Sequence, residues 1–154
     1  LDSPFEGLPG GKAAVRRGEQ RELLSALAEL AVSEQAELVL LSGDLLDSGN
    51  TYFETGEELV SALGRIPAPV FIAPGNHDFY SPQSPYARLK MPENVHVFTD
   101  KAIRCAELPA LHARVYGAAF TENRSTPLLS RAPGGRDFEH TLHPRRSRRK
   151  GLGL

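Results

Sequence analysis

Two short apolar runs, each ended by a glycine and followed by polar side chains, constrain the fold of this chain most. The runs lie at residues 38–41, before Gly43, and at residues 70–73, before Gly75. Runs that are apolar throughout are typical of strands buried on both faces of a parallel sheet. Between them, residues 54–63 have a helical pattern of apolar positions. The sequence therefore predicts a right-handed βαβ unit and an α/β fold.

The segments on either side of this unit have different patterns. Residues 1–18 are rich in Gly and Pro and predict a loop. From Glu19 onward the pattern predicts a helix with one apolar stripe, formed by Leu23, Leu24, Leu27, Leu30 and Ala31. Beyond residue 94, short runs separated by turn residues predict a β meander rather than another βαβ unit, at residues 95–98, 102–105 and 113–116.

The last part of the chain differs from the rest in charge. Residues 131–154 carry seven basic and two acidic residues, a balance of +5, and show no apolar face. We therefore divide the chain into a domain at residues 1–130 and a basic, disordered tail at residues 131–154. The tail is either a reading-frame or extension artefact or an arm that grips DNA. We favour the artefact because no aromatic residue lies within the arginine cluster at residues 145–150.

The composition excludes several classes of protein. No apolar stretch approaches the roughly 18 residues that a membrane span needs. No signal peptide is visible at the N-terminus, and a single cysteine, Cys105, cannot form an internal disulfide. Cys105 lies in an apolar-alternating run, so we expect a buried thiol. These features predict a cytoplasmic protein without a membrane partner.

Polar side chains gather after the two predicted strands. Parallel strands point the same way, so their carboxyl ends share one edge of the sheet, where ligands bind in open α/β folds. A glycine before each polar group lets the backbone turn sharply there. Divalent cations accept oxygen ligands, and imidazole suits transition metals such as Mn and Fe. The sequence therefore predicts a metal site built from Asp44, Asp47, Asn76, His77 and Asp78.

These motifs resemble those of a known family. Gly-Asp-Leu-Leu-Asp at residues 43–47 and Gly-Asn-His-Asp at residues 75–78 look like the second and third signature motifs of calcineurin-like metallophosphoesterases. Residues 41–48 and 73–78 are similar to DNA repair exonucleases of the SbcD type, and Val-Tyr-Gly at residues 115–117 resembles that branch's next strand. The resemblance implies part of an αββα sandwich, with a βαβ core followed by a β meander. It also implies phosphodiester hydrolysis, with DNA as substrate of the complete protein and an ATPase partner subunit.

The resemblance also implies a role for each site residue. Asp44 would bridge two divalent metal ions, usually manganese in these nucleases, and Asn76 would bind the second ion. His77 would act on the phosphate or protonate the leaving oxygen, while Asp78 holds its ring in the right tautomer. Asp47 would support a metal ligand rather than bind an ion itself, and a capping or turn role fits it equally well.

Two parts of the family pattern have no counterpart here. The Asp-x-His motif of the first strand is absent, and residues 1–5 resemble the segment that follows it, so we expect an incomplete part of the domain. The late histidines, His140 and His143, lack the glycine of the family's Gly-His-x-His motif. We therefore expect the isolated chain to hydrolyse little. The alternatives are a phosphomonoesterase or nucleotide phosphodiesterase on the same scaffold, and a non-catalytic remnant or binding module.

Overall fold

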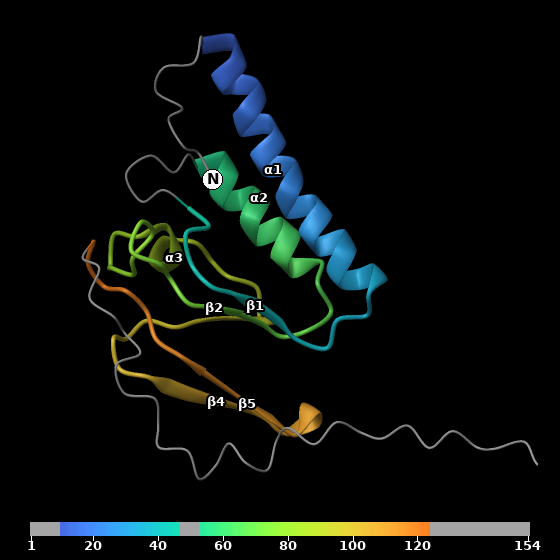
Figure 1. Ribbon diagram of the computed structural model, residues 1–154, viewed down its shortest axis with the longest axis vertical. Coiled ribbons are helices and arrows are strands. Elements are labelled where there is room, and N and C mark those ends of the chain that lie inside the picture. The colour runs from blue at the N-terminus through green and yellow to red at the C-terminus, as the bar shows by residue number, and fades with distance from the viewer. Residues whose placement is uncertain (1–9, 47–52, 124–154) are drawn as a thin grey trace, which may run out of the picture.

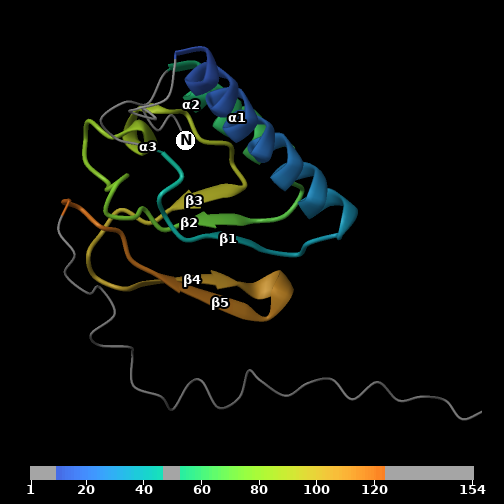
Figure 2. The same cartoon turned by 45° about the horizontal axis from the view of Figure 1, so that its top comes forward.

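The computed structural model of the protein describes residues 10–46 and 53–123. These residues form three layers, seen edge-on in Figure 2: a pair of long helices, a parallel sheet and an antiparallel hairpin. Helices α1 (Gly10–Ser33) and α2 (Phe53–Gly64) lie side by side over one face of the parallel sheet (Figure 1). The predicted α/β architecture is therefore confirmed.

The parallel sheet has the strand order β1-β2-β3, with β1 at Val39–Leu41, β2 at Val70–Ile72 and β3 at Val95–Val97. All three residues of β2 are buried, as the sequence predicted. The same prediction is wrong for β1, where Leu40 is 61% exposed. The reason is its place in the sheet. Strand β2 is central, whereas β1 is an edge of the described sheet, and only Phe71, the β2 neighbour of Leu40, packs with the hairpin residue Val115.

The prediction of a meander beyond residue 94 is wrong for its first strand. Strand β3 pairs in parallel with β2, in the same sheet as β1. A three-residue run says nothing about the direction in which a strand pairs. Residues 73–94, which include the short helix α3 (Pro85–Arg88), are long enough for the crossover that a parallel connection needs.

The other two predicted runs do form an antiparallel hairpin, as Figure 1 shows. Strand β4 (Arg104–Leu108) is joined to β5 (Ala113–Gly117) by the short turn η1 (Pro109–Leu111). The prediction that Cys105 is buried is wrong, because its side chain is exposed. Successive strand residues face opposite sides, so Ala106 packs against the cluster around Phe71 while Cys105 faces outward.

Helix α1 differs from its prediction at both its start and its packing. It begins at Gly10, so the predicted loop is wrong for residues 10–18. Residues 12–17 are mostly good helix formers, and extending a packed helix adds one hydrogen bond for each residue fixed. The predicted apolar stripe is also too wide, because Leu23 and Leu30 are 66% and 57% exposed. The buried line is narrower and consists of Leu24, Ala28 and Ala31.

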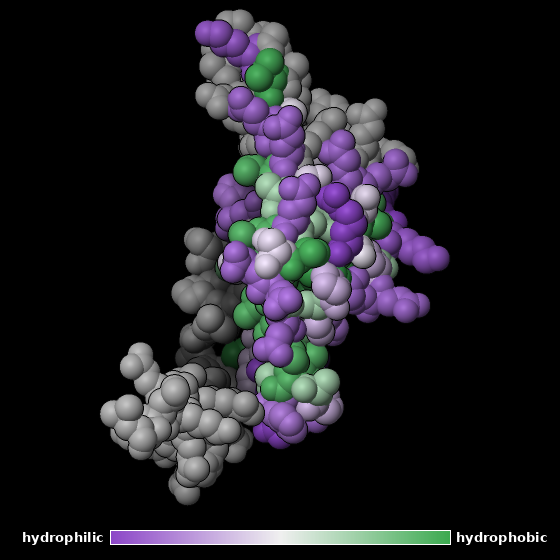
Figure 3. Space-filling view, turned by 90° about the vertical axis from the view of Figure 1, so that its right-hand side faces the viewer, coloured by the Kyte–Doolittle hydropathy of each residue, from purple (hydrophilic) through white to green (hydrophobic). Residues whose placement is uncertain are grey.

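The outer face of α1 carries its exposed apolar side chains among polar ones, without a continuous apolar patch (Figure 3). Within the described ranges, no helix has the length and apolar character needed to cross a membrane. The predicted tail at residues 131–154, with His140 and His143, lies outside the described residues.

Candidate metal centre

The turns that follow β1 and β2 are in direct contact at the carboxyl edge of the sheet. The N–H of Ala73 donates to the carbonyl of Leu41 at 2.9 Å, which extends the pairing of these strands toward the turns. A Cβ atom added to Gly43 would lie 2.6 Å from the backbone nitrogen of Gly75. A Cβ atom added to Gly75 would lie 2.5 Å from Oδ1 of Asp44. The close approach of the two turns therefore requires glycine on both sides.

The first turn has an uncommon backbone conformation. Gly43 has φ 78° and Asp44 has φ 56°, so two consecutive residues are left-handed. Glycine adopts this region freely, and aspartate is among the few other residues enriched in it. Turns of this kind can direct successive N–H groups toward one point and so form a concave site for an anion. Here that anion is a side chain of the second turn.

The carboxylate of Asp78 occupies this concavity and is fully buried. It accepts four backbone N–H bonds and one phenol O–H bond, so the negative charge is compensated on both oxygens. Oδ1 accepts from Asp44 at 3.0 Å and Gly75 at 2.6 Å; Oδ2 accepts from Leu45 at 2.9 Å, Leu46 at 3.3 Å and the hydroxyl of Tyr86. This one side chain thus joins both turns to helix α3.

The predicted roles of Asp78 and His77 stay predictions. A carboxylate has about four acceptor sites, so the five donors leave Asp78 little capacity to orient the imidazole of His77. His77 itself is exposed, and its backbone N–H donates to Oδ1 of Asp44 at 3.3 Å. The second turn therefore contacts the first both through a buried carboxylate and through a bond to the exposed Asp44.

The residues predicted to bind metal offer part of a ligand set. Asp44 is exposed and Asn76 is half-buried, and Asn76 is adjacent to the residue that bonds the Asp44 carboxylate. Their carboxylate and amide oxygens suit a hard divalent cation. In residues 10–46 and 53–123, however, no group of three or more His, Cys, Asp or Glu side chains is placed to hold an ion. Asp47 lies outside the described residues.

Tyr86 is a contact that the sequence analysis missed. Its side chain is 4% exposed and its hydroxyl donates to Asp78. Burial, followed by the negative charge of Asp78 and the bond to it, raises the pKa of Tyr86 far above its usual value. The sequence carried only a faint signal, since Ser84 and Pro85 mark a helix start just before this tyrosine. The direction of its hydroxyl depends on the fold.

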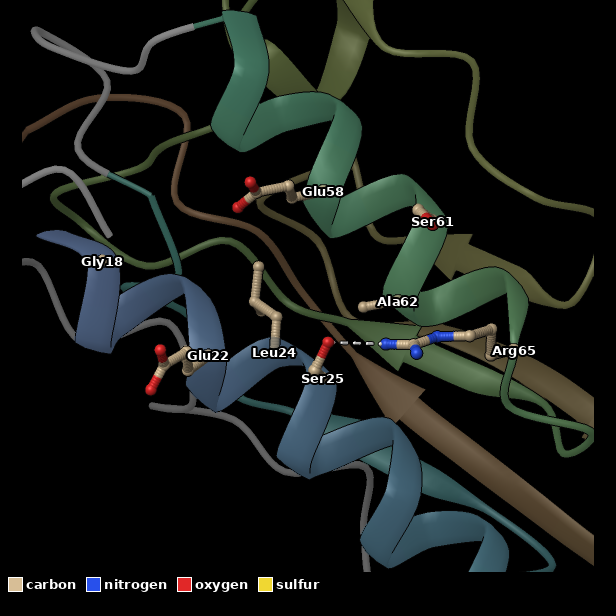
Figure 4. A pocket seen from close by; sticks show the side chains of 8 residues that line it. All are labelled: Gly18, Glu22, Leu24, Ser25, Glu58, Ser61, Ala62 and Arg65. Carbon is tan, nitrogen blue, oxygen red and sulfur yellow. Dashed lines mark hydrogen bonds between the residues drawn. The ribbon is translucent and has the colours of Figure 1, made fainter.

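A groove of about 470 Å³ lies elsewhere, between α1 and α2 (Figure 4). Arg65 reaches across it, and its Nη2 donates to Oγ of Ser25 at 2.9 Å. The groove is also lined by Glu22 and Glu58, whose negative charges would oppose a phosphate group. None of the predicted metal or catalytic residues lines this groove, so it is a separate feature of the helical layer.

The comparison with protein families identifies the class of this chain. The family model of the calcineurin-like phosphoesterases matches residues 16–143. The chain therefore belongs to this family of phosphate ester hydrolases, whose members generally bind divalent metal ions. The matched range runs past the predicted domain boundary at residue 130.

Two curated relatives narrow the comparison. The chain is 32% identical over 138 residues to the SbcD subunit of the nuclease SbcCD from Rhodobacter capsulatus, covering 86% of this chain and 27% of that protein. It is 30% identical over 105 residues to "Uncharacterized metallophosphoesterase YhaO" of Bacillus subtilis, covering 64% of this chain and 25% of that protein. The chain thus spans about a quarter of the length of these relatives. No solved structure matches it.

Proposed function

We propose that this chain forms part of the catalytic centre of a metal-dependent phosphodiester hydrolase that acts on DNA ends. The observation that carries the proposal is the contact between the two motif turns. The exposed carboxylate of Asp44 accepts a bond from His77, next to Asn76, at the carboxyl edge of a parallel sheet. An edge of this kind is where α/β sheets bind ligands. Family membership supplies the reaction class, the hydrolysis of phosphate esters.

In this proposal each exposed side chain has one task. Two divalent cations, when bound, would supply an activated water and hold the phosphate oxygens. Asp44 and Asn76 would hold the cations with their oxygen atoms, and Asp47 would support them. The imidazole of His77, which lies exposed beside Asp44, would give its proton to the departing oxygen. Asp78 would act from below, by holding the first turn in place.

The finer parts of the proposal rest on the relatives. One of them is named as part of a nuclease, which supports DNA as the substrate and a second, ATP-hydrolysing subunit as the partner. Manganese is the cation we propose, because both oxygen donors and an imidazole suit it. We also propose a cytoplasmic location, since a single cysteine shows no reliance on disulfides.

The substrate is tested with the product of the complete gene. With Mn²⁺, we expect cleavage of linear duplex DNA, little action on covalently closed circles and little turnover of phosphomonoesters. His77→Ala should reduce cleavage by a factor of roughly 10² or more, the contribution of a positioned general acid. His96→Ala is the matched control, because His96 is another exposed histidine, on β3 and away from the turns. Turnover of phosphomonoesters without DNA cleavage would assign the protein to the alternative class.

The 154-residue chain by itself should bind Mn²⁺ weakly, at a single site, and show little hydrolysis of bis-nitrophenyl phosphate. The reason is the partial ligand set of the described residues, because ion affinity depends on ligand number and geometry. Titration calorimetry and a colorimetric assay check this. Micromolar binding of two ions, with turnover abolished by His77→Ala, would show that residues outside the described ranges complete the site.

A further inference from the structure

The conformation of the Asp44 turn needs support from outside the turn. Two consecutive left-handed residues place Asp44 at φ 56°, a region that an aspartate keeps only where its surroundings hold it. The direction of the Asp44 carboxylate depends on this backbone angle. Whatever holds the turn therefore also sets where a metal ligand points.

Asp78 supplies that support from the neighbouring turn. Its oxygens accept the N–H groups of three successive residues of the first turn, Asp44, Leu45 and Leu46. Oδ1, which binds the N–H of Asp44, also binds the N–H of Gly75 in its own turn. The two turns therefore cannot separate without breaking bonds to a buried charge, which are stronger than neutral ones.

Tyr86 in turn holds Asp78 from the helical side of the sheet. Its ring belongs to the core cluster that includes Leu59 of α2, and its hydroxyl bonds to Oδ2, the oxygen that also accepts from Leu45 and Leu46. Helix α3 is closed by the bond from the N–H of Leu89 to the carbonyl of Pro85, at 2.9 Å. The Leu89 side chain packs closely on Gly56 of α2. The phenol is thus fixed by packed elements on both of its sides.

We propose that Tyr86 is a positioning residue that acts through Asp78 to set the direction of the Asp44 carboxylate toward a divalent cation. The cation rests on the proposed function, whereas the effect on the turn does not. A ring that only filled space would need no hydroxyl. The hydroxyl here donates to a buried carboxylate, and the raised pKa of Tyr86 keeps it a donor at neutral pH.

The first test is amide hydrogen exchange in the 154-residue chain without metal, comparing the unsubstituted protein with Tyr86→Phe. We expect the amides of Asp44, Leu45 and Leu46 to exchange roughly tenfold faster relative to the β2 amides, because a bond to a charged partner is lost. Tyr80→Phe is the matched control, since it removes a hydroxyl from a half-buried tyrosine that packs against both core clusters. A uniform rise across β2 and the turn would reduce Tyr86 to general packing and overturn the proposal.

The second test is Mn²⁺ affinity, measured on the same three proteins by calorimetry and by paramagnetic broadening of turn resonances. We expect the Kd of Tyr86→Phe to rise several-fold and that of Tyr80→Phe to stay unchanged. Faster exchange of the turn with unchanged affinity would overturn the positioning step and leave the proposed function standing. Absence of ion binding in the unsubstituted protein would overturn the proposed function and the metal step together, while the exchange result would still decide whether Tyr86 sets the turn.

Discussion

The turns after β1 and β2 begin alike, with a glycine followed by a residue that suits a metal, yet they do opposite things. The first turn is left-handed at Gly43 and Asp44 and presents backbone N–H groups. The second turn has no residue of positive φ and presents the Asp78 carboxylate to those groups. One turn supplies donors in an unfavourable conformation, and the other supplies the anion that makes the conformation stable.

The comparison separates two reasons for a glycine. Gly43 is required both by its backbone angle and by its contact with Gly75, whereas Gly75 is required by contact alone. The sequence analysis gave both glycines the same task, a sharp turn off a strand. That explanation holds for Gly43, the one glycine in the described residues with a positive φ. The same motif letter therefore reflects two different physical constraints.

Removal of the anion should give the largest effect. Asp78→Ala leaves four N–H groups and the Tyr86 hydroxyl without their acceptor, and should lower the free energy of unfolding by about 4 kcal/mol. Urea denaturation measures this. The control is Asp100→Ala, which removes an exposed-bond acceptor of the N–H of Ala102 and should shift the midpoint far less. Equal shifts would mean that the buried carboxylate does not hold the turns together.

The two glycines should rank next, and unequally. Gly43→Ala strains a left-handed residue and brings Cβ against the backbone of Gly75, so we expect about 3 kcal/mol of destabilisation. Gly75→Ala has only the steric conflict with Asp44 and should cost about 2 kcal/mol. Both values come from denaturation midpoints at a common slope. A larger effect at Gly75 would break the distinction drawn between the turns.

A smaller effect is expected at alkaline pH. The pKa of Tyr86 is raised from 10.0, so above that pH the unfolded chain releases the phenol proton while the folded chain keeps it. The folded state then binds more protons, and its stability falls as pH rises, by about 1 kcal/mol between pH 10 and about pH 11. Tyr86→Phe should remove this component. A pH slope in that window that is unchanged by Tyr86→Phe would show that the phenol titrates normally.

The smallest effect is expected on the hairpin. Cys105→Ser changes an outward-facing side chain on β4, so the free energy of unfolding should stay within about 0.5 kcal/mol. Thiol labelling of the folded chain should be as fast as labelling of the unfolded chain, because the side chain is exposed. Slow labelling, or destabilisation above about 2 kcal/mol, would restore the buried thiol that the sequence suggested.

Much of the fold could be read from the sequence because its signals are local. The apolar runs that became β1 and β2, the helix that ends at Gly64 and the strand at Val-Tyr-Gly are each encoded within a few residues. The errors have one cause. The pairing direction of β3, the exposure of Leu40 and the burial line on α1 depend on which element packs alongside. Local pattern carries no record of such neighbours.

The candidate site divides in the same way. The sequence by itself determined the family and the residues gathered at the sheet edge, because motif spacing and strand direction suffice for that. Only the tertiary structure decided that Asp78 is a buried anion between two turns and that Tyr86 donates to it. The bonds from Asp78 to the first turn join residues 32 to 34 positions apart in the chain. Such bonds exist only once the sheet has brought the ends of its strands together.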